Sequence, residues 1–150
     1  MRLTITAAAA VTAFLFATPG SAAEVFKDYV RSKEVDDMSF VHVTPGRLDD
    51  YLDGLRQTWL STCELQKKYG AAIDCAIYAS TTMANRDFNL VLVVKRPSAA
   101  MADPDEKRYN STMAELRRQL AEDKQKKLVQ SYEEMRTMFG QQEFRQLTFK

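Results

Sequence analysis

The pattern of apolar and polar residues predicts strands at four places along residues 38–150. Residues 38–43, MSFVHV, are apolar and β-branched and stop at Thr44-Pro45-Gly46, which is typical of a strand ended by a proline. Residues 88–95 are apolar on both faces, as expected of a central strand that is covered on both sides. Alternation of apolar and polar residues predicts two more strands, at residues 73–80 and 143–149.

Between the first two predicted strands, apolar residues recur at steps of three and four, as on one face of a helix. This helix is expected to begin after Thr44, with Thr44 as its cap and Pro45 in its first position. Asp49 and Asp50 then oppose the positive end of the helix dipole. The apolar stripe runs through Leu48, Leu52, Leu55, Trp59 and Cys63, and the helix is expected to end near Tyr69-Gly70.

A second helical pattern runs from about Asp105 to Phe139. Its register weakens at residues 123–127, where a break or bend is expected, and Gly140 is expected to end it. The resulting order of strand, helix, two strands, helix and strand is the α+β, ferredoxin-like βαββαβ arrangement. Right-handed crossovers then place both helices on one face of a four-stranded antiparallel sheet, with the strands at 38–43 and 88–95 in the middle.

Two helices cover only one face of such a sheet. Phe40, Tyr78 and one side of residues 88–94 are then expected to lie on the uncovered face. An apolar sheet face in water usually marks an interface. The simplest partner is a second copy of the chain, so we expect a homodimer in which two sheets close over each other into a barrel.

The N-terminal residues 1–23 have the pattern of a secretory signal peptide. Arg2 is followed by an apolar run, a Pro-Gly break and small residues before Glu24, where cleavage is expected. The run is shorter than the ~20 apolar residues that cross a bilayer, so a membrane anchor is not expected before or after cleavage. We expect a bacterial protein in the periplasm or secreted, with residues 24–37 forming a short helix or arm and residues 38–150 forming the domain.

Charge and histidine content exclude several functions. Without Arg2, the 21 basic residues become 20 and equal the 20 acidic ones, so there is no basic excess for binding nucleic acid. His42 is the only histidine, which leaves too few ligands for a typical metal site. We therefore expect no cofactor and no metal.

Three segments carry a resemblance to a known superfamily: FVHVTPGRLDDYLDGLRQTW, NLVLVV and EEMRTMFGQQEFRQLTF. They resemble the dimeric α+β barrel proteins, which include antibiotic-biosynthesis-type monooxygenases, NIPSNAP-like domains and exported bacterial proteins of unknown function. The resemblance covers roughly residues 38–149 and implies the fold more than an activity. We expect a non-catalytic protein that holds a small apolar ligand between the sheets. One alternative is a cofactor-independent monooxygenase acting on a small aromatic substrate. Another is a structural envelope-stress or interaction protein with no pocket.

Four residues are the candidates for lining the space between the sheets: Phe40, His42, Tyr78 and Asn89. His42 alternates with two valines, so it shares a face with Phe40, either as a general base or as a residue held inside a closed cavity. Haem-degrading relatives carry their axial histidine on a helix, whereas His42 is predicted on a strand. Trp59 also belongs to the alternative enzyme, but its helical spacing favours a core position.

The two cysteines, Cys63 and Cys75, lie at similar depths from the turn that joins the first helix to the second strand. A disulfide between them fits this geometry and an exported protein. The alternative is two buried free thiols, and the sequence leaves both open. Their spacing is not that of a redox-active pair.

Overall fold

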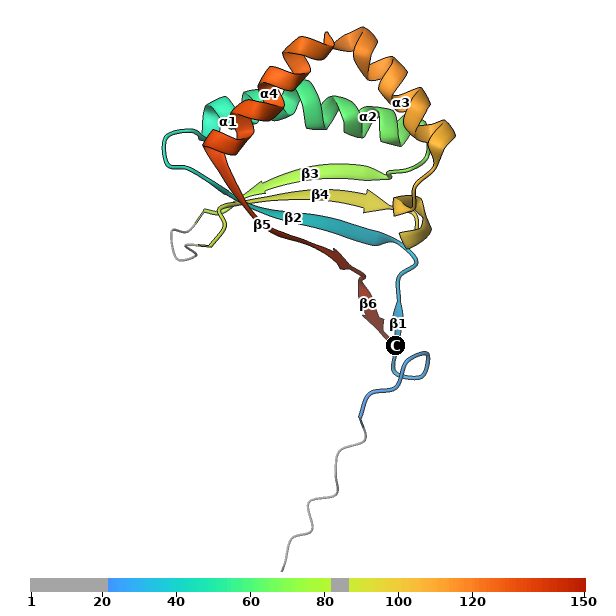
Figure 1. The fold of residues 1–150 in the computed structure, drawn as a ribbon. Helices are drawn as coiled ribbons and strands as arrows, with labels where there is room; N and C mark the ends of the chain where they lie inside the picture. Colours follow the sequence, from blue (N-terminus) through green and yellow to red (C-terminus); the bar gives the residue numbers. More distant parts are fainter. Residues whose placement is uncertain (1–21, 82–86) are drawn as a thin grey trace, which may run out of the picture.

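The computed structural model describes residues 22–81 and 87–150. The predicted signal peptide therefore lies outside the described residues except for Ala22 and Ala23. The main sheet has four antiparallel strands in the order β3-β4-β2-β5 (Figure 1). Their bounds are Val35–Val43 for β2, Asp74–Ala79 for β3, Leu90–Arg96 for β4 and Arg136–Phe144 for β5.

The helices all lie on one face of this sheet, and the other face is left open (Figure 1). One continuous helical stretch comprises α1 (Leu48–Leu55), the π-helical segment η1 (Arg56–Leu60) and α2 (Ser61–Lys68). A short 3-10 turn, η2 (Ala99–Ala102), precedes α3 (Glu106–Gln119) and α4 (Glu122–Met135). Together with β2 and β4 at the centre, this confirms the predicted α+β, ferredoxin-like fold.

The hydrophobic core lies between the helices and the sheet. Apolar side chains from alternate positions of β2 and β4 meet side chains from α1 and α4. The buried members are Val41, Val43, Tyr51, Leu55, Leu90, Leu92, Tyr132 and Met135, with Leu52, Trp59 and Ile77 packed against them. The helical spacing of Trp59 therefore did predict a core position.

The core stripe on the first helix is displaced from the predicted one. Tyr51 and Thr58 are buried, whereas Leu48, placed on the stripe by its spacing, is exposed. The five π-helical residues of η1 explain part of this difference, because a wider turn changes the angular spacing on which the prediction relied.

The first helix begins with a different structure from the one predicted. Arg47 N donates a hydrogen bond to Thr44 O over 3.0 Å, and Gly46 has a φ of +80°. Thr44 to Arg47 therefore form a β-turn with proline second and glycine third, as in type II. The predicted cap by Thr44 and first position for Pro45 are wrong, since the helix begins at Leu48 after Arg47, which makes no side-chain cap.

The end of this helix is as predicted. Gly70 has a φ of +70°, a conformation that glycine adopts without a Cβ penalty. Gly70 N donates to Lys67 O over 3.0 Å, and Ala71 N donates to Gln66 O over 2.8 Å. This pair of bonds is the Schellman motif, which satisfies the last carbonyl groups of the helix.

The long second helix breaks and ends earlier than predicted. Leu120 and Ala121 have extended ψ values of 119° and 137°, so the break between α3 and α4 lies just before residues 123–127. The helix ends at Met135 rather than at Phe139, and Gly140 lies inside β5. Residues 136–144 pair with β2 from Asp36 to Val43, and this tertiary pairing overrides their helical spacing.

Of the helix or arm expected at residues 24–37, the helix is wrong, and the final strand is also corrected. Residues 24–37 contain no helix, and β2 begins at Val35 instead of Met38. Asp37 is buried in β2, where it pairs with Arg96 at 3.4 Å and accepts a hydrogen bond from Gln141. The final strand splits into β5 and β6 (Leu147–Phe149), and β6 pairs with β1 (Tyr29–Arg31) in a separate two-stranded sheet.

Candidate functional site on the open sheet face

The open face of the main sheet has an apolar centre. The register places Tyr78, Val91 and Phe40 in one row across β3, β4 and β2. Ala76, Val93 and Met38 form the next row. All these positions alternate with core-facing ones, so they point away from the helices.

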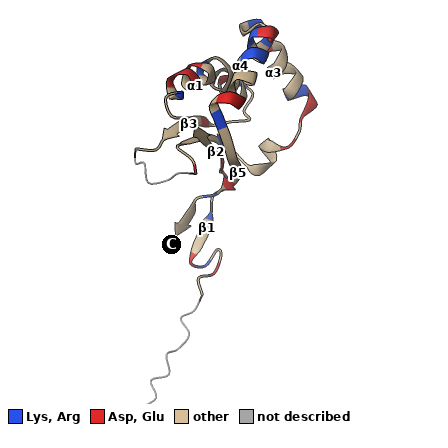
Figure 2. Cartoon of the chain, turned by 60° about the vertical axis from the view of Figure 1, so that its left-hand side comes forward, with Lys and Arg blue, Asp and Glu red and all other residues tan. Residues whose placement is uncertain are grey.

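One end of the open face is charged. The row after Ala76, Val93 and Met38 contains Asp74, Lys95 and Asp36. Lys95 also pairs with Glu34 at 2.9 Å, and this hydrogen bond and charge raise the pKa of Lys95. Most charged residues lie instead on the helices, while the strands are largely uncharged (Figure 2). An apolar centre with a polar margin is the usual anatomy of a protein interface.

Aromatic rings concentrate around Phe40. Its ring centroid lies 4.9 Å from that of Phe88 and 6.5 Å from that of Phe144. Tyr78 and Phe139 are 61% and 52% exposed, respectively. Exposed aromatic side chains gathered on one face indicate a binding surface.

Phe139 reaches this face because of a bulge in β5. Phe40 pairs with Gly140 and Val41 pairs with Met138, so Phe139 is an extra residue without a partner in β2. Gly140 has a φ of +148°, which glycine tolerates at such an irregularity. Sequence reasoning placed Phe139 on a helix and therefore missed it, and it did not single out Phe88 or Phe144.

The structure brings three of the four predicted site residues onto the same face. Phe40 and Tyr78 share a row, and His42 lies two residues beyond Phe40 on β2. The His42 ring lies 6.4 Å from the Phe139 ring in an edge-on arrangement. The His42 Nδ1 atom is buried and makes no hydrogen bond within residues 22–81 and 87–150.

Asn89 has a structural role that the prediction did not include. Its Nδ2 atom donates to Val43 O, and its Oδ1 atom accepts from Val43 N, both over 2.8 Å. Its backbone N also donates to Val41 O over 3.0 Å. The Asn89 side chain thus extends the pairing of β4 with β2, and both of its polar atoms have partners. Its assignment to the ligand site is therefore not supported.

Replacing Asn89 with aspartate is expected to lower the free energy of unfolding by about 2 kcal/mol. A carboxylate cannot donate to Val43 O and instead places negative charge beside it. Urea unfolding measures the effect, with Asn89→Ala as the control that removes both bonds without adding charge. Stability unchanged in both variants would mean that these two bonds do not hold the end of β2.

A cavity lies away from the predicted site residues. A cavity of about 490 Å³ is bordered by α2, η2 and the start of α3, with Gln66, Met101 and Tyr109 in its wall. None of Phe40, His42, Tyr78 and Asn89 lines it. This cavity is therefore not the site that the sequence predicted.

A polar cluster on the helical side of the sheet was not predicted. Thr58 Oγ1 and Tyr132 Oη are 2.6 Å apart, and the Arg136 guanidinium lies over the rings of Tyr51 and Tyr132. Burial raises the pKa of Tyr51, and the charge of Arg136 opposes this. Burial also raises the pKa of Tyr132, although its hydrogen bond with Thr58 acts to lower it. Both phenols therefore stay protonated near neutral pH, consistent with a structural role in the core.

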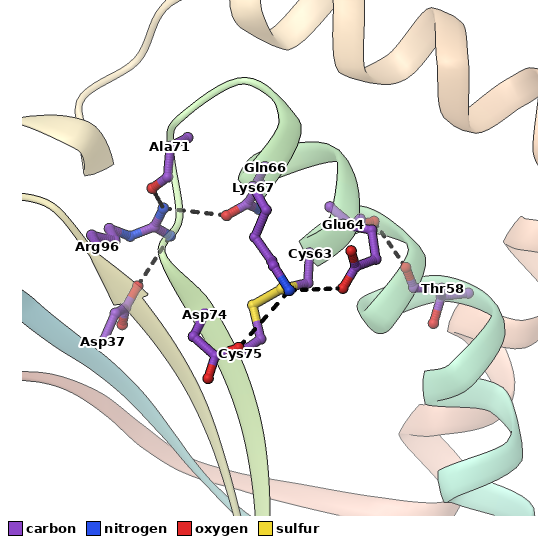
Figure 3. The surroundings of a disulfide bond; sticks show 11 residues. Asp37, Thr58, Cys63, Glu64, Gln66, Lys67, Ala71, Asp74, Cys75 and Arg96 are labelled. Atoms are coloured by element: carbon purple, nitrogen blue, oxygen red, sulfur yellow. Dashed lines mark hydrogen bonds and ion pairs between the residues drawn. A yellow bond between two sulfur atoms is a disulfide. The ribbon is translucent and has the colours of Figure 1, made fainter.

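Cys63 and Cys75 are joined in a disulfide in the structure (Figure 3). Their Cα atoms are 6.4 Å apart, and the bond links α2 to the edge strand β3. Beside it, Lys67 pairs with Glu64 at 3.2 Å and with Asp74 at 3.9 Å. Of the two alternatives left open by the sequence, the structure contains the bridge.

Within the part of the chain that the structure describes, no group of three or more His, Cys, Asp or Glu side chains is arranged to hold a metal ion. No helix among these residues has the length and hydropathy needed to span a bilayer.

No protein-family model matches the chain, and no curated protein matches it significantly. Among solved structures it is similar to HapK from Hahella chejuensis, at 13% identity over 75% of this chain and 91% of that one, with a TM-score of 0.44. A protein of unknown function from Bacteroides thetaiotaomicron, described as a possible oxidoreductase, shares 15% identity over 77% and 99% of the two chains, with a TM-score of 0.40. A dimeric ferredoxin-like protein from an uncultured marine organism shares 11% identity over 79% and 90%, with a TM-score of 0.41.

At these identities and TM-scores, the similarity gives no basis for transferring a function. The topology and the open face of this chain itself define its class, a ferredoxin-like α+β protein with one uncovered, aromatic-rich sheet face.

Proposed function

We propose that this chain is an exported protein that works as a homodimer, with the open sheet faces of two copies enclosing a small apolar ligand. The observation that carries the proposal is the aromatic cluster of Phe40, Phe88 and Phe144 on the face that none of the described helices covers. Phe40 and Phe88 are half-buried and Phe144 is 42% exposed, so a partner of matching chemistry would bury the apolar surface that remains. A second copy provides the same apolar centre and polar margin, related by a two-fold axis.

Two features support export. The N-terminal residues have the charge, apolar run and small residues of a signal peptide, although they lie outside the described part of the chain. The disulfide between Cys63 and Cys75 is a bond that persists in an oxidising compartment such as the periplasm.

Polar groups on the open face lie toward its margins, with Thr137 and Gln142 on the edge strand β5 and a charged row of Asp36, Lys95 and Asp74 at one end. His42 and Tyr78 lie on the open face among apolar side chains, so the ligand that suits this space is small and mainly apolar. The alternative monooxygenase needs several polar groups converging on its substrate. Asn89 uses its amide on Val43, and Trp59 packs against the core, so the observed contacts favour binding over catalysis.

Native mass spectrometry of protein exported to a bacterial periplasm tests the proposal. We expect a dimer of chains that begin at Glu24, each lighter by two hydrogens because of the disulfide, and carrying an added mass that is released on denaturation. A dimer without added mass would show that no ligand is bound, and a monomer would contradict the proposed function.

A further inference from the structure

The two-stranded sheet formed by β1 and β6 projects from the body of the protein. We call it the terminal ribbon and include in it the turn before β1, residues 25–28. Figure 1 shows the ribbon leaving the main sheet on the side opposite the helices, and Figure 2 shows the same from a second direction. The ribbon therefore extends into the space where the second sheet of the proposed dimer lies.

The terminal ribbon has exposed apolar side chains. Phe149 and Leu147 on β6 are 69% and 48% exposed, respectively. The ring centroids of Phe149 and Tyr29 are 5.9 Å apart. Phe26 at the tip is also exposed and has a φ of +69°, an unfavourable conformation for a residue with a side chain. A two-stranded ribbon is only marginally stable alone in water and needs a further surface to pack on.

We infer that the terminal ribbon packs against the second copy of the chain, so that each copy clasps the edge of its partner's sheet. This inference rests on the proposed dimer and names a second contact within it. Phe144, the last residue of β5, belongs to the aromatic cluster on the open face, and only two residues separate it from the ribbon. The apolar surface of the ribbon thus continues the apolar surface of the open face.

The length of the ribbon fits this contact. Each of its strands has three residues, which at ~3.3 Å per residue span roughly 10 Å. Stacked sheets pack about 10 Å apart, so a ribbon of this length reaches the layer of the second sheet. In a two-fold symmetric dimer both ribbons make the same contact, which doubles its contribution.

The test compares two double variants by sedimentation velocity over a range of protein concentrations. Leu147→Ser with Phe149→Ser removes the exposed apolar side chains of β6. Val129→Ser with Tyr109→Ser is the matched control, since these residues on the helices are 48% and 64% exposed. We expect the ribbon variant to raise the dimer dissociation constant by roughly 10- to 100-fold and the control to leave it unchanged.

A second measurement keeps the ribbon intact. With the photo-crosslinker p-benzoylphenylalanine in place of Phe149, irradiation is expected to join two chains, and peptide mapping is expected to place the bond on the partner's sheet. Bonds only within one chain would contradict the inference. An unchanged dissociation constant in the ribbon variant would also contradict it. If that variant instead lost binding to phosphatidylglycerol vesicles while its dimer was unaffected, the ribbon would pack on a membrane surface and the inference would be wrong. A monomeric unaltered protein would instead refute the proposed function itself.

Discussion

Replacing Phe40 with aspartate is expected to convert the protein to monomers at micromolar concentration. Phe40 lies on a central strand of the open face and contacts the rings of Phe88 and Phe144. In the proposed dimer, the carboxylate is buried without a partner, which raises the dissociation constant by roughly 100-fold or more. Sedimentation velocity measures the change directly.

The fold of the monomer is expected to survive this change, because Phe40 points away from the core between the sheet and the helices. Phe40→Leu keeps an apolar side chain and is expected to keep the dimer, with a dissociation constant within about tenfold of the original. Val129→Asp places the same charge on the helical side and serves as the control for charge alone. An unchanged dimer in Phe40→Asp would place the interface elsewhere.

Removing the disulfide is expected to lower the free energy of unfolding by about 3 kcal/mol. The bond closes a loop between residues separated by 12 positions, and it holds α2 against the edge strand β3. Cys63→Ala combined with Cys75→Ala avoids placing new hydroxyl groups at these sites, one of which is buried. Urea unfolding of the variant and of the unaltered protein measures the difference.

Dithiothreitol provides an independent check on the same bond. It is expected to destabilise the unaltered protein to a similar extent and to have no further effect on the double alanine variant. Free thiols that react with iodoacetamide before any reductant is added would show that the bond is absent from the purified protein.

The main sheet and its order could be predicted from the sequence because local patterns suffice for them. Residues 38–43 and 88–95 are apolar on both faces, which fits only central strands, and the right-handed crossover rule sets the rest. The same alternation placed Phe40, His42 and Tyr78 on one face, where the structure has them.

Features that depend on distant contacts were missed. The pairing of β1 with β6 joins residues 29–31 to residues 147–149, and three-residue strands give no recognisable period. Phe139 fits a helical pattern that Gly140 would end, until the pairing of the neighbouring residues with β2 is known. Asn89 is a residue type that often binds ligands, and only the position of Val43 shows that both polar atoms of its side chain are hydrogen-bonded within the sheet.

The central claim is that two open sheet faces meet, and intermolecular nuclear Overhauser effects test it most directly. The sample mixes chains labelled in valine methyl groups with chains labelled in phenylalanine rings. Contacts between the Phe40 ring of one copy and the Val91 or Val93 methyl groups of the other are the predicted result. Intermolecular contacts from phenylalanine rings only to the Val129 methyl groups on α4, with none to Val91 or Val93, would contradict the account.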